Sequence, residues 1–171
     1  GIIGFGNIGK KVAKICTSFG MKILYFDKIR AVKKLEKELN AQFVSKDTIM
    51  KKSDIISIHL HLNNETNKII DKKFIKNMKK NSILINVSRA QLVDNNALLL
   101  ALQKNKIRGA GLDVHDREPT LKNDKLNNHP SVVVTPHISG STYDTYLRVI
   151  TSCLENIKST IKNKKNIKWE I

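Results

Sequence analysis

The chain has 171 residues, 40% of them hydrophobic, and a formal net charge of +16. This length suits one domain with a buried core, and no apolar run approaches the ~20 residues of a membrane span. No signal peptide is visible, and Cys16 and Cys153 fit neither a metal motif nor a disulfide framework. We therefore expect a cytoplasmic protein with no metal site and no membrane partner.

The positive charge raises the question of nucleic-acid binding. Lysine supplies nearly all of it, however, and the lysines are scattered along the chain without interleaved aromatic residues. We interpret them as a solvated surface and expect no nucleic-acid partner. A modest role in attracting an anionic substrate or cofactor stays open.

The first notable motif is a glycine-rich turn at the very start of the chain. An apolar pair leads directly into the spacing G-x-G-x-x-G at Gly4, Gly6 and Gly9. Gly4 permits a sharp turn, Gly6 lets the backbone approach phosphates, and Gly9 lets a helix pack on a strand. The N-terminus of that helix offers N–H groups and a positive dipole end to an anion. The motif predicts a dinucleotide pyrophosphate site, and its position leads us to expect a further segment before Gly1.

Apolar runs alternate with amphipathic stretches from end to end. In chain order we expect strand 2–4, helix 8–19, strand 22–26, helix 31–40, strand 42–44, helix 47–51, strand 54–60, helix 71–78, strand 82–87, helix 94–105, strands 109–114 and 132–135, and helix 139–161. Asp94 is the expected N-cap of helix 94–105. The alternation predicts a doubly wound α/β fold with a parallel sheet, whose ligands bind beyond the carboxyl ends of the strands.

Asp27 follows the second expected strand, 18 residues after Gly9. A carboxylate there can accept both hydroxyls of an adenosine ribose and would repel a 2′-phosphate. The alternative is a helix-capping or surface residue. Lys28 and Arg30 lie nearby and can soften the preference, so the sequence favours NAD over NADP without deciding between them.

Three later strand ends carry polar clusters that contain Arg89, Glu118 and His137. An arginine can hold a carboxylate in a bidentate fork and polarise a carbonyl oxygen. A histidine can transfer a proton near neutral pH, and a carboxylate partner would orient it and raise its pKa. Each residue alone has a structural alternative: a surface ion pair, a loop charge or a turn. Together, at one expected sheet edge, they predict a catalytic site for a small anionic substrate.

These residues, in this order, resemble the NAD-binding domain of the D-isomer-specific 2-hydroxyacid dehydrogenases. The resemblance covers nearly the whole chain and implies a Rossmann-like domain at 1–140, with a C-terminal helix and tail at 141–171. The matching segments are 4–9, Asp27, 59–66, 86–89, Asp113 with Val114, Glu118 with Pro119, and 135–140.

The resemblance also implies roles for single residues. Arg89 would bind the substrate's carboxylate and carbonyl oxygen, His137 would exchange the hydroxyl proton, and Glu118 would hold His137. Hydride would pass between the substrate and the nicotinamide of NAD. The residues implied to contact the cofactor are Gly4, Gly6, Asn7, Ile8, Gly9, Asp27, Leu60, Val87, Ser88, Arg89, Asp113, His137, Ser139 and Gly140.

The chain departs from the family pattern at three positions. Ala90 stands where glycine is usual after the arginine, His61 replaces a usual proline, and His115 replaces a more common aromatic or apolar residue. We interpret His59, His61, His115 and His129 as non-catalytic. None of these departures affects the three catalytic positions.

The family's substrate-binding domain, built mostly from the segment before the nucleotide loop, is largely missing here. We therefore expect this chain to bind NAD but not to turn over alone, and expect a homodimer for a full-length enzyme. The expected substrate is a small 2-hydroxy or 2-oxo acid, and the sequence of residues 137–142 favours D-3-phosphoglycerate among such acids. The alternative function is that of an NAD-sensing binding protein, a corepressor of the same fold.

Overall fold

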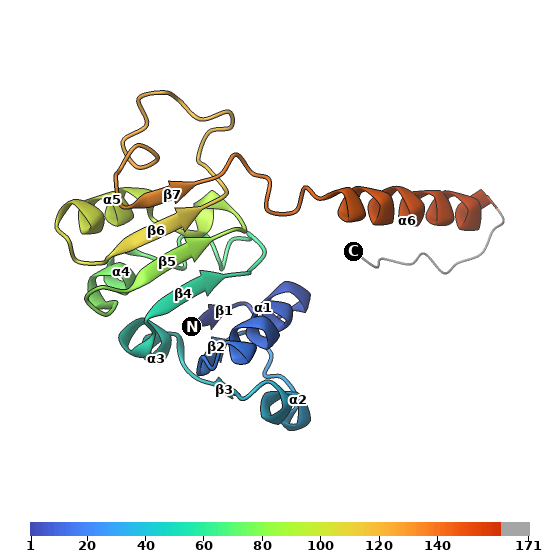
Figure 1. The fold of residues 1–171 in the computed structure, drawn as a ribbon, viewed down its shortest axis with the longest axis horizontal. Helices are drawn as coiled ribbons and strands as arrows, with labels where there is room; N and C mark the ends of the chain where they lie inside the picture. The colour runs from blue at the N-terminus through green and yellow to red at the C-terminus, as the bar shows by residue number, and fades with distance from the viewer. Residues whose placement is uncertain (162–171) are drawn as a thin grey trace. The chain divides into compact units, whose positions relative to one another are not determined.

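The computed structural model describes residues 1–161, which form an alternating series of strands and helices (Figure 1). The elements in chain order are β1 (Ile2–Ile3), α1 (Asn7–Ser18), β2 (Ile23–Phe26), α2 (Lys33–Glu38), β3 (Ala41–Phe43), α3 (Lys46–Lys52), β4 (Ile55–Ile58), α4 (Lys72–Asn77), β5 (Ile83–Asn86), the 3₁₀ turn η1 (Ala90–Leu92), α5 (Asn95–Gln103), β6 (Gly109–Leu112), β7 (Val132–Val134) and α6 (Tyr143–Ile161).

The strands form one parallel sheet in the order β3-β2-β1-β4-β5-β6-β7. The chain winds outward from β1 to β3, then returns to the other side of β1 and continues to β7. In register, Ile3 pairs with Phe26 of β2 and with Ile58 of β4. The reversal between β1 and β4 is the place where doubly wound sheets open a crevice for ligands. The predicted doubly wound α/β fold is confirmed.

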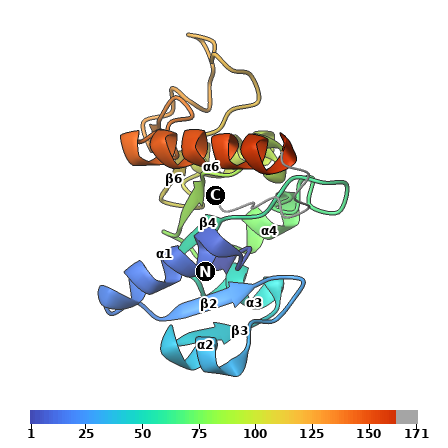
Figure 2. The same cartoon turned by 90° about the vertical axis from the view of Figure 1, so that its right-hand side faces the viewer.

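Helices cover both faces of this sheet, and the sheet separates two clusters of buried residues. Successive strand residues point to opposite faces, so Ile3 joins one cluster of buried residues and Ile2 joins the other. The cluster around Ile3 includes side chains of α3, α4 and α5, whereas the cluster around Ile2 includes Ala13 of α1 and Leu39 after α2. Both views show α1 and α3 on opposite sides of the strands (Figure 2).

Short polar side chains begin several helices as the sequence suggests. The predicted N-cap Asp94 accepts a hydrogen bond from the Ala97 N–H at 3.0 Å, and Asp71 caps α4 through the Phe74 N–H at 2.6 Å. Each bond satisfies one N–H of the first turn, which has no partner inside the helix. These caps set where the helices that cover the larger core begin.

Most helix boundaries agree with expectation to within about two residues, and two helices begin at least two residues later than expected. The helix expected from residue 31 begins at Lys33, because Val32 is extended at the N-cap. The helix expected from residue 139 begins at Tyr143, and the Thr142 hydroxyl accepts a hydrogen bond from the Thr145 N–H at 3.2 Å. The 3₁₀ turn η1 was not expected, since three residues are too few to give a periodic pattern.

The chain divides into two compact units, Gly1–Pro136 and His137–Ile171, and each is described by itself. Within the second unit, α6 carries a stripe of exposed apolar side chains that includes Ile150, Leu154 and Ile157. The tail that the sequence predicts after this helix lies outside the described residues. Among residues 1–161, no helix is both long enough and apolar enough to cross a bilayer.

Candidate active site and cofactor site

The glycine turn after β1 has the geometry that its sequence requires. Gly4 adopts φ +96°, in the region that side chains other than glycine rarely enter. A Cβ on Gly9 would lie 2.1 Å from the Gly4 carbonyl oxygen, so only glycine allows α1 to pack this closely on the turn. A Cβ on Gly6 would meet nothing within 4 Å. The structural reasons given for Gly4 and Gly9 are confirmed, and Gly6 leaves open space beside the backbone.

The N-terminus of α1 is suited to an anion. Gly6 is the N-cap, no side chain among the described residues caps the helix, and its first turn has no acidic residue. Asn7 and Ile8 begin the helix and are exposed. Because N–H groups of a first turn have no intrahelical partner, they suit the phosphates of a dinucleotide. The residues present therefore fit the pyrophosphate of NAD. Contacts with it stay predictions for Gly4, Gly6, Asn7, Ile8 and Gly9.

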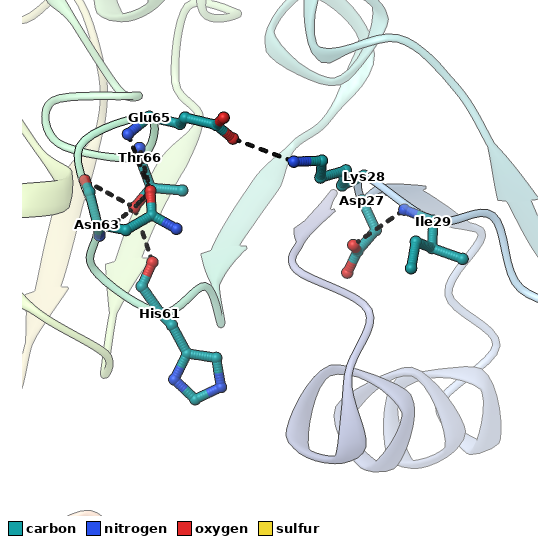
Figure 3. Close-up of polar contacts among 7 residues, drawn as sticks. All are labelled: Asp27, Lys28, Ile29, His61, Asn63, Glu65 and Thr66. Carbon is teal, nitrogen blue, oxygen red and sulfur yellow. Dashed lines mark hydrogen bonds and ion pairs between the residues drawn. The ribbon is translucent and has the colours of Figure 1, made fainter.

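Asp27 lies just beyond β2 and is bonded to the glycine turn. One carboxylate oxygen accepts a hydrogen bond from the Phe5 N–H at 2.5 Å. Figure 3 shows the bond that the other oxygen accepts from the Ile29 N–H at 3.3 Å. Each oxygen of a carboxylate has two acceptor sites, so both retain capacity for a ribose hydroxyl. The backbone bonds fix the carboxylate at the carboxyl end of the sheet, beside the reversal between β1 and β4.

Ser88, one of the residues predicted to contact the cofactor, links the segments that follow β4 and β5. The Ser88 hydroxyl donates to the Leu60 carbonyl oxygen at 2.7 Å. Asn86 is 1% exposed, donates to the Arg89 carbonyl oxygen at 2.9 Å and accepts from the Ser88 N–H at 3.1 Å. This buried amide shapes the turn that contains Val87 and Ser88. Its structural role was not predicted, and its place at the end of an apolar strand is the signal that could have found it.

Arg89 follows that turn with an exposed side chain, and its guanidinium donates to the Ser88 carbonyl oxygen at 2.6 Å. The 3₁₀ turn η1 begins at the next residue, Ala90, which is buried and 3% exposed. The side chain that replaces the usual glycine is therefore small and buried. The cation therefore projects from the carboxyl end of β5.

The end of β6 carries the acidic residues of the site. Asp113 is 2% exposed and accepts a hydrogen bond from the Thr135 hydroxyl at 2.5 Å. Glu118 is exposed and accepts a hydrogen bond from the His115 N–H at 3.1 Å, just before a cis bond to Pro119. The strands β5 and β6 are neighbours, so Arg89 and Glu118 follow adjacent strands at the same edge of the sheet.

Two histidines near this edge are held inside the protein. His59 Nε2 lies 2.9 Å from the Ser57 hydroxyl, and burial lowers the pKa of His59. His115 Nε2 lies 2.9 Å from the Thr135 carbonyl oxygen. Both bonds support the interpretation that these histidines are structural.

His137, Ser139 and Gly140 belong to the second unit. His137 has φ +55°, an uncommon backbone conformation for a residue other than glycine. It follows β7 by three residues, after Thr135 and Pro136 of the first unit. The structure thus places Arg89 and Glu118 on one edge, while the grouping of His137 with them stays a prediction.

The strand order, the glycine turn and Asp27 define the class of protein as a Rossmann-type dinucleotide-binding domain. Comparison with known proteins then gives the family. Residues 1–139 match the family model described as "D-isomer specific 2-hydroxyacid dehydrogenase, NAD binding domain". The chain belongs to the D-isomer-specific 2-hydroxyacid dehydrogenase family and corresponds to its NAD-binding domain.

Similar proteins share both the sequence and the fold. A glyoxylate reductase of Thermococcus litoralis is 46% identical over 144 residues, which are 84% of this chain and 43% of that protein. A D-lactate dehydrogenase from Aquifex aeolicus, solved with NAD and lactic acid, is 33% identical and has a TM-score of 0.86. The match covers 95% of this chain and 53% of that one. An acyclic imino acid reductase solved with NADPH and D-Arg is 36% identical, with a TM-score of 0.85 and coverage of 95% and 50%. This chain therefore spans about half the length of its relatives.

Proposed function

We propose that this chain is the cofactor-binding half of an NAD-dependent oxidoreductase that interconverts D-2-hydroxy acids and 2-oxo acids. The observation that carries the proposal is the succession of Asp27, Arg89 and Glu118 at the carboxyl ends of β2, β5 and β6 in a domain of this family. Those ends share one edge of a parallel sheet, where doubly wound proteins bind their ligands.

In the proposed mechanism, Arg89 binds the carboxylate of the substrate. Its exposed guanidinium can form two parallel hydrogen bonds with a carboxylate and polarise the adjacent carbonyl oxygen. Bound NADH would supply the hydride for reduction of that carbonyl, and NAD⁺ would accept it in the reverse direction. Arg89 stays charged throughout, so it stabilises negative charge that develops on the oxygen.

His137 acts as the acid and base in this proposal. Its imidazolium donates a proton to the carbonyl oxygen during reduction, and the neutral ring accepts the hydroxyl proton during oxidation. Glu118 orients the ring and stabilises its charged form. Rate effects of about 10²–10⁴-fold are typical for such a proton transfer.

The substrate is proposed to be a small 2-oxo or 2-hydroxy acid. Names among the relatives include glyoxylate reductase and 4-methyl-2-oxopentanoate reductase, and a solved neighbour holds lactic acid. These names make glyoxylate the first substrate to test, whereas only the run 137–142 favours D-3-phosphoglycerate. Catalysis is proposed to need the other half found in the relatives, in a cytoplasmic homodimer without nucleic-acid or membrane partners.

The test is an assay of a protein that contains this chain together with its substrate-binding half. Glyoxylate and other 2-oxo acids should each be mixed with NADH while the nicotinamide absorbance is followed. Consumption of NADH with at least one of them is the expected result. Tight NAD binding without turnover of any 2-oxo or 2-hydroxy acid would contradict the enzyme and favour the NAD-sensing binding protein.

A further inference from the structure

The cations beside Asp27 bear on which dinucleotide the domain accepts. One solved neighbour holds NAD and another holds NADPH, so this fold accommodates either cofactor. The two differ by a phosphate on the adenosine ribose, which sites for NADP commonly balance with a nearby arginine. Lys28 and Arg30 are the cations closest along the chain to Asp27, and the structure records what each of them contacts.

Arg30 is engaged by a glutamate of α2. Its Nε donates to Glu36 Oε1 at 2.9 Å and its Nη2 donates to Oε2 at 2.8 Å, which is a bidentate pair. The guanidinium carbon also lies 5.6 Å from the centroid of the Phe43 ring on β3. These contacts hold the cation against α2 and the edge strand, whereas Asp27 is bonded to the glycine turn of β1.

The Glu36 carboxylate is positioned by a hydrogen bond from a buried tyrosine. The Tyr25 hydroxyl donates to Glu36 Oε1 at 2.6 Å and accepts a hydrogen bond from the Ala31 N–H at 3.0 Å. The Tyr25 ring is fully buried and stacks on Phe5 with 3.9 Å between centroids. Hydrogen bonds from Arg30 and then Tyr25 lower the pKa of Glu36 to about 2. The carboxylate is therefore charged and fixed at neutral pH.

Lys28 has a weaker restraint on the other side of Asp27. Its ammonium lies 3.4 Å from a carboxylate oxygen of Glu65, in the loop after β4 (Figure 3). The side chains are 82% and 75% exposed, so this pair contributes little. Asn63 positions Glu65 by accepting a hydrogen bond from its N–H at 2.9 Å.

We propose that Glu36 is a specificity-determining residue, which restricts the site to NAD by holding Arg30 away from the ribose. With Arg30 so engaged, Asp27 is the charge that meets the ribose hydroxyls, and a 2′-phosphate finds no free guanidinium to balance it. Lys28, whose exposed pair with Glu65 contributes little, has no part in this selection. This inference rests on the proposed dinucleotide function and adds a positioning role for a residue that does not touch the cofactor.

The test is the ratio of NAD to NADP dissociation constants, measured by titration calorimetry on this 171-residue chain. Glu36→Gln should raise the affinity for NADP about tenfold, because Arg30 becomes available for a charge-assisted bond, and should change the affinity for NAD less than about threefold. Glu38→Gln is the matched control, since it removes the same charge from an exposed position of α2. It should leave the ratio unchanged.

A double variant separates this role from a loosening of the fold. In Glu36→Gln/Arg30→Gln the gain in NADP affinity should disappear, whereas Arg30→Gln alone should change neither affinity. Tyr25→Phe, which removes one support of Glu36, should give a smaller gain. An unchanged ratio in Glu36→Gln, or a gain that persists without Arg30, would overturn the inference. Failure of the unaltered chain to bind either dinucleotide would instead contradict the proposed function.

Discussion

His115 Nε2 lies 2.9 Å from the carbonyl oxygen of Thr135, and this hydrogen bond ties the segment after β6 to the end of β7. The ring nitrogen must donate to a carbonyl oxygen, so Nε2 carries the proton. His115 Nδ1 then carries no proton, so its 3.3 Å approach to Asn127 Oδ1 is a contact between two acceptors. A position where the family more commonly has an aromatic or apolar residue thus holds two chain segments together in this protein.

His115→Phe should therefore destabilise the domain. It removes the hydrogen bond to the Thr135 carbonyl oxygen, at a cost of about 1 kcal/mol in the free energy of unfolding. Urea unfolding followed by circular dichroism measures this change. His61→Gln is the control, because His61 is exposed and its backbone oxygen, not its ring, accepts the hydrogen bond from the Thr66 hydroxyl. Equal stability of His115→Phe and the unaltered chain would show that the ring is not structural.

Gly9→Ala should lower the stability of the domain, whereas Gly6→Ala should lower its affinity for NAD. The added methyl group at Gly9 would clash with the Gly4 carbonyl oxygen, and overpacking of this kind costs about 1–3 kcal/mol. The methyl group at Gly6 meets open space, so the fold should be retained while the affinity for NAD falls. Thermal unfolding and calorimetric titration distinguish the two. Normal NAD affinity in Gly6→Ala would argue against a pyrophosphate at this turn.

Asp27→Ala should weaken the binding of NAD at least about tenfold, because the ribose loses charge-assisted hydrogen bonds. Asp47→Asn, an exposed carboxylate in the first turn of α3, provides a control for the loss of charge. Calorimetry at one ionic strength compares the two variants. Equal affinity for NAD in the Asp27→Ala and Asp47→Asn variants would contradict the binding of the ribose by Asp27.

Glu36 should make the stability of the domain depend on pH in the acid range. Hydrogen bonds from Arg30 and Tyr25 lower its pKa from an ordinary 4.5 to about 2 in the folded chain. The unfolded chain therefore takes up the proton first as the pH falls, so the stabilisation is complete above about pH 4.5 and is lost towards pH 2. The difference in unfolding free energy between the unaltered chain and Glu36→Gln should shrink over that window. A difference that does not vary with pH would contradict the pairing.

The sequence predicted well those features that depend on residues close to one another along the chain. The succession of strands and helices follows from alternating apolar and amphipathic stretches, and the glycine turn and the Asp94 cap are short-range patterns. The Tyr25, Glu36 and Arg30 network was not predicted, because it joins a strand, a helix and a loop through side-chain conformations that spacing does not encode. Asn86 was missed as a structural residue, although its place at the end of an apolar strand is a signal that the sequence carries.

The sequence predicts the places of the catalytic residues only in part. Arg89 and Glu118 were expected at one sheet edge from their places after two strands; β5 and β6 are neighbours, and the grouping of the two side chains in one site stays a prediction. The role of His137 depends on the family resemblance, since it belongs to the second unit. Its left-handed backbone is a local feature that the Pro136–His137 sequence alone did not reveal.

The most direct test of the proposed chemistry is the effect of His137→Gln on a protein that contains both halves. The variant should lose at least about 10²-fold in kcat, because the proton transfer is lost, while the dissociation constant for NADH changes less than about twofold. Stopped-flow fluorescence gives the binding constant and steady-state assays give kcat. An unchanged kcat, or an equal loss of kcat and NADH affinity, would contradict the assignment of His137 as the proton donor.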